Sequence, residues 1–169
     1  MEILICDGVL QVNNLPSFNV GNHNQAIEII TAAVQNADLT GVTHEMLSDL
    51  YFGSEHVVTN RADEGVIETP TFVATFMVSL AHQRWHSTNK ETSRPNGELH
   101  WLDPCCGAGV FPRAVIDFHI DKLGAKEISD IPRITIVDLN LLGLTSTLFS
   151  IKLALERKGL DFSEYIKSQ

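Results

Sequence analysis

The fold of this chain is decided by residues 99–111, Leu99-His100-Trp101-Leu102-Asp103-Pro104-Cys105-Cys106-Gly107-Ala108-Gly109-Val110-Phe111. An apolar segment, which predicts a buried strand, ends in an acid and continues into a turn that contains glycine. Apolar residues then recur at helical spacing from 110 to 118, so the sequence predicts a strand, a tight turn and a helix. Glycine lets the backbone of such a turn approach a ligand closely and adopt positive φ. The unit therefore predicts an α/β domain that binds a nucleotide-type cofactor.

A second strand ending in an acid follows this unit. The run Ile134-Thr135-Ile136-Val137-Asp138 is β-branched, and residues 141–158 then predict a helix that ends at Gly159. An acid in this position accepts hydrogen bonds from ribose hydroxyls in dinucleotide-binding folds, which makes Asp138 the candidate. Two structural alternatives stay open: Asp138 as a solvated carboxylate at a strand end, and Asp103 as the N-cap of the helix after the turn.

The same residues carry a family resemblance. The string DPCCGAGVF at 103–111 resembles the DPxCGxG loop of S-adenosylmethionine-dependent methyltransferases, in the form found in adenine-specific DNA methyltransferases of restriction-modification systems. Upstream, Gly65-Val66-Ile67-Glu68-Thr69-Pro70 and the apolar residues after it resemble the other cofactor segment of that family. The resemblance covers residues 47–155.

The resemblance implies a Rossmann-like methyltransferase core, preceded by a helical N-terminal region, that binds S-adenosylmethionine. The implied cofactor-binding residues are Ile67, Thr69, Asp103, Pro104, Cys105, Gly107, Gly109, Asp138 and Leu139. The start of the helix after Thr69 and Pro70 would face the methionine carboxylate, because the exposed amides of a helix N-terminus favour an anion. A capping threonine followed by proline is also what any well-formed helix start shows.

No catalytic residue is assigned. Family members hold the flipped adenine with an Asn/Asp-Pro-Pro-aromatic motif, and the sequence has none. We therefore expect the front portion of a methyltransferase, incomplete at its C-terminus and inactive alone, that works with a catalytic half, a specificity subunit or a second copy. The alternatives are a non-catalytic cofactor-binding remnant or regulatory subunit, and a methyltransferase for a protein or small molecule.

Composition limits the partners. The chain of 169 residues is 44% hydrophobic and carries a net charge of −9, so DNA contact is expected through a separate domain rather than through this acidic chain. No stretch predicts a membrane span or a signal peptide, which favours the cytoplasm.

Three cysteines predict neither a disulfide framework nor a zinc site, and we expect no metal. Cys106 is expected to pack beside the ligand, and the histidines are expected to be single surface or core residues.

The region before the cofactor segments is less informative. The runs Ile3-Leu4-Ile5-Cys6 and Val9-Leu10-Gln11-Val12 flank Asp7-Gly8, which favours a hairpin. Apolar residues at 26–34 predict one helix, and Met46, Leu47, Leu50 and Tyr51 predict the buried face of another. We expect this hairpin and helical region to span residues 1–64 and the cofactor-binding core to span residues 65–169.

Overall fold

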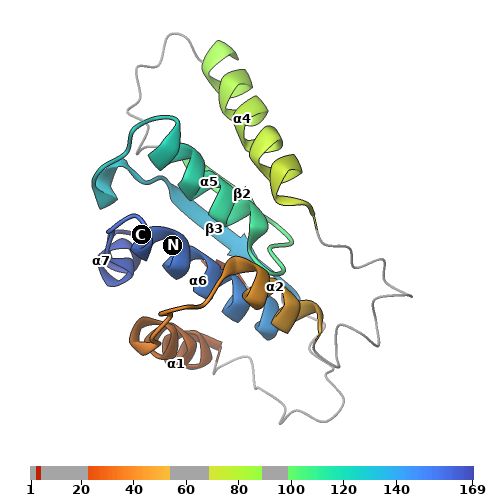
Figure 1. Ribbon diagram of the computed structural model, residues 1–169, viewed down its shortest axis with the longest axis vertical. Helices are drawn as coiled ribbons and strands as arrows, with labels where there is room; N and C mark the ends of the chain where they lie inside the picture. The colour runs from red at the N-terminus through yellow and green to blue at the C-terminus, as the bar shows by residue number, and fades with distance from the viewer. Residues whose placement is uncertain (1–2, 5–22, 54–68, 89–98) are drawn as a thin grey trace.

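The computed structural model describes residues 3–4, 23–53, 69–88 and 99–169. Figure 1 shows helices gathered around a small sheet. The strands are β1 (Ile3–Leu4), β2 (His100–Asp103) and β3 (Arg133–Val137). The helices are α1 (His23–Asn36), α2 (His44–Phe52), α4 (Thr71–Thr88), α5 (Val110–Asp121), α6 (Leu141–Glu156) and α7 (Phe162–Ser168), with a 3-10 turn, η3, at Ile128–Asp130.

The sheet is parallel, and its strand order is β1-β3-β2. Trp101 pairs with Ile134 and Asp103 pairs with Ile136, so β2 and β3 end at the same edge. The helix α5 connects these two strands, as parallel pairing requires. The prediction of an α/β fold is confirmed at this level, and so are the strand, turn and helix expected from residues 99–118.

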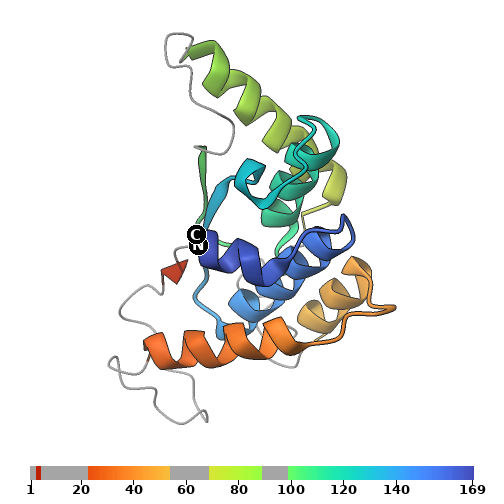
Figure 2. The same ribbon diagram turned by 90° about the vertical axis from the view of Figure 1, so that its left-hand side faces the viewer.

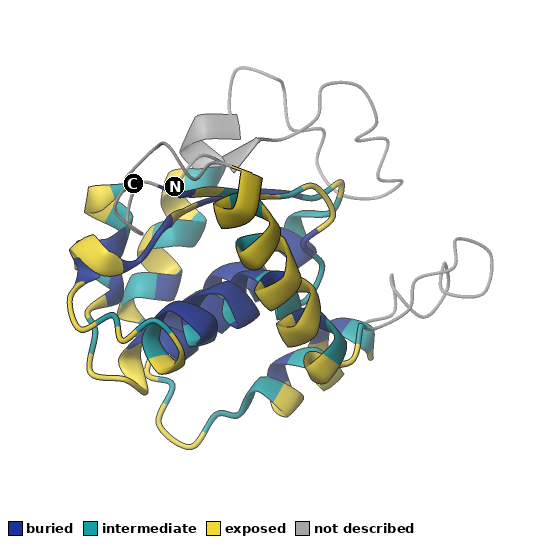
Figure 3. Cartoon of the chain, turned by 90° about the horizontal axis from the view of Figure 1, so that it is seen from above, coloured by how far each residue is buried: buried dark blue, intermediate teal, exposed yellow. Residues whose placement is uncertain are grey.

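The core lies between the sheet and the helices. Both α5 and α6 lie on one face of the sheet (Figure 2) and pack against each other. The helix α6 is surrounded on most sides and is the most deeply buried helix (Figure 3). Its residues Leu148, Ile151 and Leu155 belong to the same apolar cluster as Ile134 and Ile136 of β3. This packing fixes α6 under the edge where β2 and β3 end.

The expectation that the apolar segment before Asp103 forms a buried strand is wrong. Leu99 is buried, but His100 is exposed and the side chain of Leu102 is 63% exposed. Side chains alternate between the two faces of a strand, and the described helices cover only the face to which Trp101 belongs. In the described sheet, β2 is also an edge strand with β3 as its neighbour.

The N-terminal helices pack on α6 and share its core. Val34 of α1 lies in the main apolar cluster, and the ammonium group of Lys152 in α6 donates to the carbonyl of Gln35 at 3.2 Å. In α2, Leu47 and Tyr51 are buried, whereas the expected core residues Met46 and Leu50 are exposed. The expectation for Met46 and Leu50 is wrong, because only Leu47 and Tyr51, at positions i and i+4, face α6.

Part of the expected N-terminal hairpin lies in the sheet. Ile3 and Leu4 form a strand that pairs in parallel with β3, opposite Ile136 and Val137. The other expected strand, at residues 9–12, lies outside the described residues. Within the described part of the chain, no helix has the length and apolar character needed to cross a membrane.

Candidate functional site

Two glycines shape the turn between β2 and α5. Gly107 and Gly109 have φ angles of +50° and +85°, in the left-handed region that favours glycine. A Cβ atom at Gly109 would lie 2.8 Å from Cα of Thr147 and 2.9 Å from Cβ of Ser150, so the turn approaches α6 as closely as a backbone can. At Gly107 the nearest atoms would be 3.8 Å away, on the ring of Tyr51.

Two hydroxyl groups of α6 hold this turn. Thr147 Oγ1 donates to the carbonyl of Gly107 at 3.0 Å, and Ser150 Oγ donates to the carbonyl of Ala108 at 2.9 Å. Both side chains are buried polar groups. They satisfy carbonyl groups that the turn leaves without partners, which fixes the conformation of the turn before any ligand binds. No local sequence pattern points to either residue.

Asp138 follows β3 and connects it to the turn. Its Oδ2 atom accepts a hydrogen bond of 2.8 Å from the amide of Gly107, and its Oδ1 atom accepts one of 2.8 Å from the amide of Asn140. A Cβ atom at Gly143 would lie 2.7 Å from Cγ of Asp138, so a glycine in the first turn of α6 makes room for the carboxylate. The thiol of Cys106 also donates to Oδ2, at 4.0 Å. A carboxylate has about four lone-pair sites, so roughly one of them, on Oδ1, remains for a ligand. Asp138 is therefore not a free solvated carboxylate.

Asp103 lies at the end of the neighbouring strand β2. Its Oδ1 atom accepts from the amide of Cys105 at 3.2 Å, while its Oδ2 atom is buried and has no hydrogen-bond partner among the described residues. Burial raises the pKa of this carboxyl group, and the charge of Asp138 raises it further. The N-cap of α5 is Gly109, so the alternative of Asp103 as the helix cap is wrong. An unpaired, buried carboxylate oxygen is costly and calls for an explanation such as a ligand.

Tyr51 brings the N-terminal helix α2 to the same turn. Its ring and hydroxyl group contact the position where a side chain at Gly107 would start. Burial raises the pKa of Tyr51 to about 12, with a smaller contribution from Asp138, so the phenol stays protonated at neutral pH. The apolar spacing correctly predicts Tyr51 on a buried helix face, but no local pattern connects this residue to the turn. That connection depends on how α2 crosses α6.

The remaining expected site residues have different environments. Pro104 and Cys105 are exposed, and Cys106 is buried as expected. Burial raises the pKa of the Cys106 thiol to about 12, which keeps it from acting as a thiolate nucleophile. Leu139, directly after Asp138, is 67% exposed. Ile67 lies outside the described residues.

Thr69 lies just before α4, whose first helical hydrogen bond runs from the amide of Ala74 to the carbonyl of Pro70. The guanidinium group of Arg113, in the first turn of α5, donates to Thr71 Oγ1. This contact brings the start of α4 beside the start of α5, and α5 begins at the glycine turn. Thr69, two residues before Thr71, is therefore near the start of α5.

The structure thus places Asp103, the glycine turn, Asp138 and Leu139 at one edge of the sheet, where two parallel strands end. This is the position at which open α/β sheets bind ligands. The two acids make that edge negative, which suits a cation or a group rich in hydroxyls. Comparison with protein-family models, with curated proteins and with solved structures finds no match to the chain.

Proposed function

We propose that this chain binds S-adenosylmethionine in a Rossmann-like core and is the cofactor-binding part of an adenine-specific DNA methyltransferase. The observation that carries the proposal is the hydrogen bond of 2.8 Å from the Gly107 amide to Asp138. It joins the glycine turn after one strand to the acid after the next strand. Such an arrangement supports binding of the ribose of a nucleoside cofactor.

Charge favours a sulfonium cofactor over a dinucleotide. A pyrophosphate needs free amides or basic side chains near the glycine turn. Here the amides of Gly107 and Gly109 already donate within the protein, to Asp138 and to the carbonyl of Cys106. The basic side chain of Arg113, in the first turn of α5, donates to Thr71 Oγ1, and the neighbouring side chain at the strand ends is another acid, Asp103. S-adenosylmethionine carries an ammonium group and a sulfonium centre, and both positive charges are complementary to the carboxylates of Asp103 and Asp138. The unpaired Oδ2 atom of Asp103 would accept from the ammonium group.

The proposed roles follow from position. Asp138 would use its remaining Oδ1 lone pair for a ribose hydroxyl, and the exposed side chain of Leu139 would pack on the adenine ring. Thr69 and the first amides of α4 would meet the methionine carboxylate, because a helix N-terminus favours an anion. The backbone from Pro104 to Gly109 would line the methionine part.

Methyl transfer needs a second set of residues. In the proposed reaction, the exocyclic amine of a flipped adenine attacks the methyl carbon in line with the sulfur. The 169 residues contain no Pro-Pro-aromatic motif and carry a net charge of −9. The base pocket and the basic DNA-binding surface would therefore lie outside these 169 residues. The second candidate is a non-catalytic cofactor-binding subunit, which needs neither of them.

Leu139 gives the sharpest test, because its exposed side chain contributes little to the fold. Leu139→Ser should weaken binding of S-adenosylmethionine and its demethylated product, measured by calorimetry, by about ten- to a hundredfold. This corresponds to roughly 1.5–3 kcal/mol for a leucine side chain that a ligand buries. The matched control is Leu80→Ser on α4, where the leucine is also exposed and lies away from the turn.

Both variants should unfold at the same urea concentration as the wild type. Equal affinity of wild type and Leu139→Ser would remove Leu139 from the site. Binding of a nicotinamide dinucleotide, with no binding of S-adenosylmethionine, would contradict the proposed function itself.

A further inference from the structure

Two histidines lie one turn apart on α4, away from the glycine turn. His82 and His86 occupy positions i and i+4, and their Nε2 atoms are 3.0 Å apart. Their ring centroids are 4.3 Å apart. The expectation that the histidines are single residues is wrong for this pair. The spacing is visible in the sequence as His82-Gln83-Arg84-Trp85-His86.

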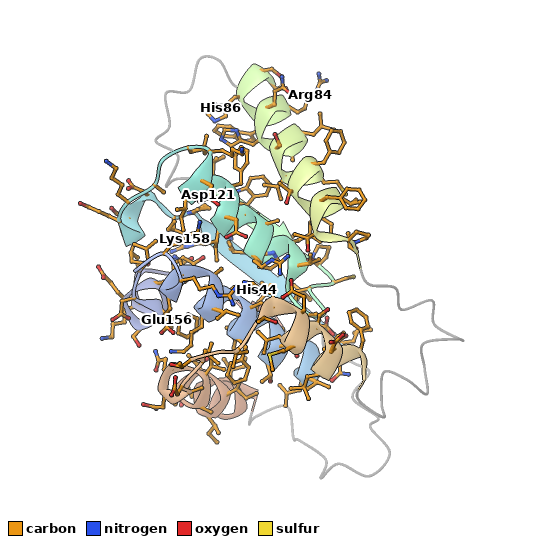
Figure 4. The ribbon with its side chains drawn as sticks, in the orientation of Figure 1. His44, Arg84, His86, Asp121, Glu156 and Lys158 are labelled. Carbon is orange, nitrogen blue, oxygen red and sulfur yellow. The ribbon has the colours of Figure 1, made fainter. Side chains whose placement is uncertain are left out.

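Neighbouring rings hold the pair in place. The ring of His82 meets the ring of Phe118 in α5 edge to face at 5.0 Å, and the ring of His86 meets Trp85 in the same way at 5.0 Å. His86 and Arg84 point to opposite sides of α4 (Figure 4), so the nearest basic side chain in the sequence is directed away from the pair. His86 is exposed, which leaves the Nε2 atoms accessible to an ion from solvent.

The separation of the two nitrogens suits chelation. Two nitrogens each ~2.0–2.1 Å from one ion lie ~3.3 Å apart in tetrahedral geometry. They lie ~2.9 Å apart in adjacent positions of a square-planar or octahedral ion. The observed 3.0 Å lies between these values. Two histidines at i and i+4 on one helix face are also the arrangement with which helices bind zinc.

We propose that His82 and His86 chelate a divalent late first-row transition ion, such as Cu²⁺, Ni²⁺ or Zn²⁺, through their Nε2 atoms. In the described part of the chain no group of three or more His, Cys, Asp or Glu side chains could hold an ion, so water fills the other coordination positions. Before binding, one ring donates its Nε2 hydrogen to the other. On binding, that hydrogen moves through solvent to Nδ1 of the same ring, and both Nε2 lone pairs then face the ion.

Trp85 provides a local readout, because a paramagnetic ion bound to the pair would quench its fluorescence. The chain has two tryptophans, so Trp101→Phe leaves Trp85 as the only one. In this background, Cu²⁺ and Ni²⁺ should quench the emission in a saturable way with one ion per chain, and Mg²⁺ should not. Zn²⁺ should compete with Ni²⁺ and reverse the quenching.

His86→Gln should weaken Ni²⁺ binding at least tenfold, because the second ligand of a chelate binds intramolecularly. The control is His100→Gln on β2, which removes a histidine that bonds Thr135 and should leave the titration unchanged. Circular dichroism checks that each variant is folded, and His82→Gln provides a second, independent loss of one ligand. Absence of quenching, or a difference below tenfold between the parent and His86→Gln, overturns the proposal.

Discussion

Replacing Gly109 by alanine tests how tightly the glycine turn is packed against α6. The φ angle of +85° costs an alanine roughly 1–2 kcal/mol. The new Cβ atom would also lie 2.8 Å from the backbone Cα of Thr147, inside van der Waals contact. Relief of that contact requires movement of the turn or of α6, and overpacking of this kind costs about 1–3 kcal/mol. We expect Gly109→Ala to lower the free energy of unfolding by roughly 2–5 kcal/mol.

Gly124→Ala is the matched control. Gly124 has a φ angle of +78°, and a Cβ atom there would meet nothing within 4 Å. Gly124→Ala should therefore lower the free energy of unfolding only by the cost of an alanine at positive φ, roughly 1–2 kcal/mol. Urea denaturation at pH 7 gives both values, with unchanged slopes if the unfolded states are alike. If the two substitutions lower the free energy of unfolding by amounts that agree within about 0.5 kcal/mol, the close approach of the turn to α6 is refuted.

Three further predictions use other polar groups. Burial raises the pKa of Asp103 above 3.8, so ionisation of Asp103 lowers the stability of the folded state. Asp103→Asn should therefore increase the free energy of unfolding at pH 7 but not below pH 3.8. Equal gains at both pH values would contradict this. Burial also lowers the pKa of His119 from 6.5 to about 4. Stability should therefore fall between pH 6.5 and 4, by up to roughly 1.4 kcal/mol per pH unit for this residue, and His119→Phe should reduce that slope in urea titrations. Tyr165→Phe should cost about 1–3 kcal/mol in urea denaturation, because it leaves the buried carbonyl of Pro132 without the hydroxyl that donates to it; no change would mean that this bond contributes nothing.

Local patterns were sufficient to predict the unit from β2 to α5. The spacing of apolar residues from 110 to 118 belongs to one helix, and the glycines interrupt it at the turn. The same holds for β3 and α6, where a β-branched run ends at an acid and Asn140 caps the helix. Each of these signals lies within a few residues of the structure that it predicts.

The rest of the candidate site depends on contacts between distant residues. Thr147 and Ser150 bond the turn only because α6 passes beneath it, about forty positions later in the sequence. Gly143 is needed because the carboxylate of Asp138 occupies the space beside it. The exposure of Leu102 likewise depends on which face of the sheet the helices cover. A single sequence contains the residues for these contacts but no local pattern that reveals them.

The two acids at the sheet edge contribute differently to stability, and this difference bears on the proposed ligand. Asp138 accepts from two amides, so its charge is compensated within the protein. Asp103 has one bonded and one orphaned oxygen, and Asp138 opposes its ionisation. A ligand that donates to Asp103 Oδ2 therefore removes a cost that the free protein bears at neutral pH. A cation achieves this and an anion does not, so the protein should be stabilised by S-adenosylmethionine and left unchanged by a free nucleoside phosphate. Asp103→Asn should make the free protein more stable than the wild type. S-adenosylmethionine should then raise the free energy of unfolding of this variant by less than it raises that of the wild type.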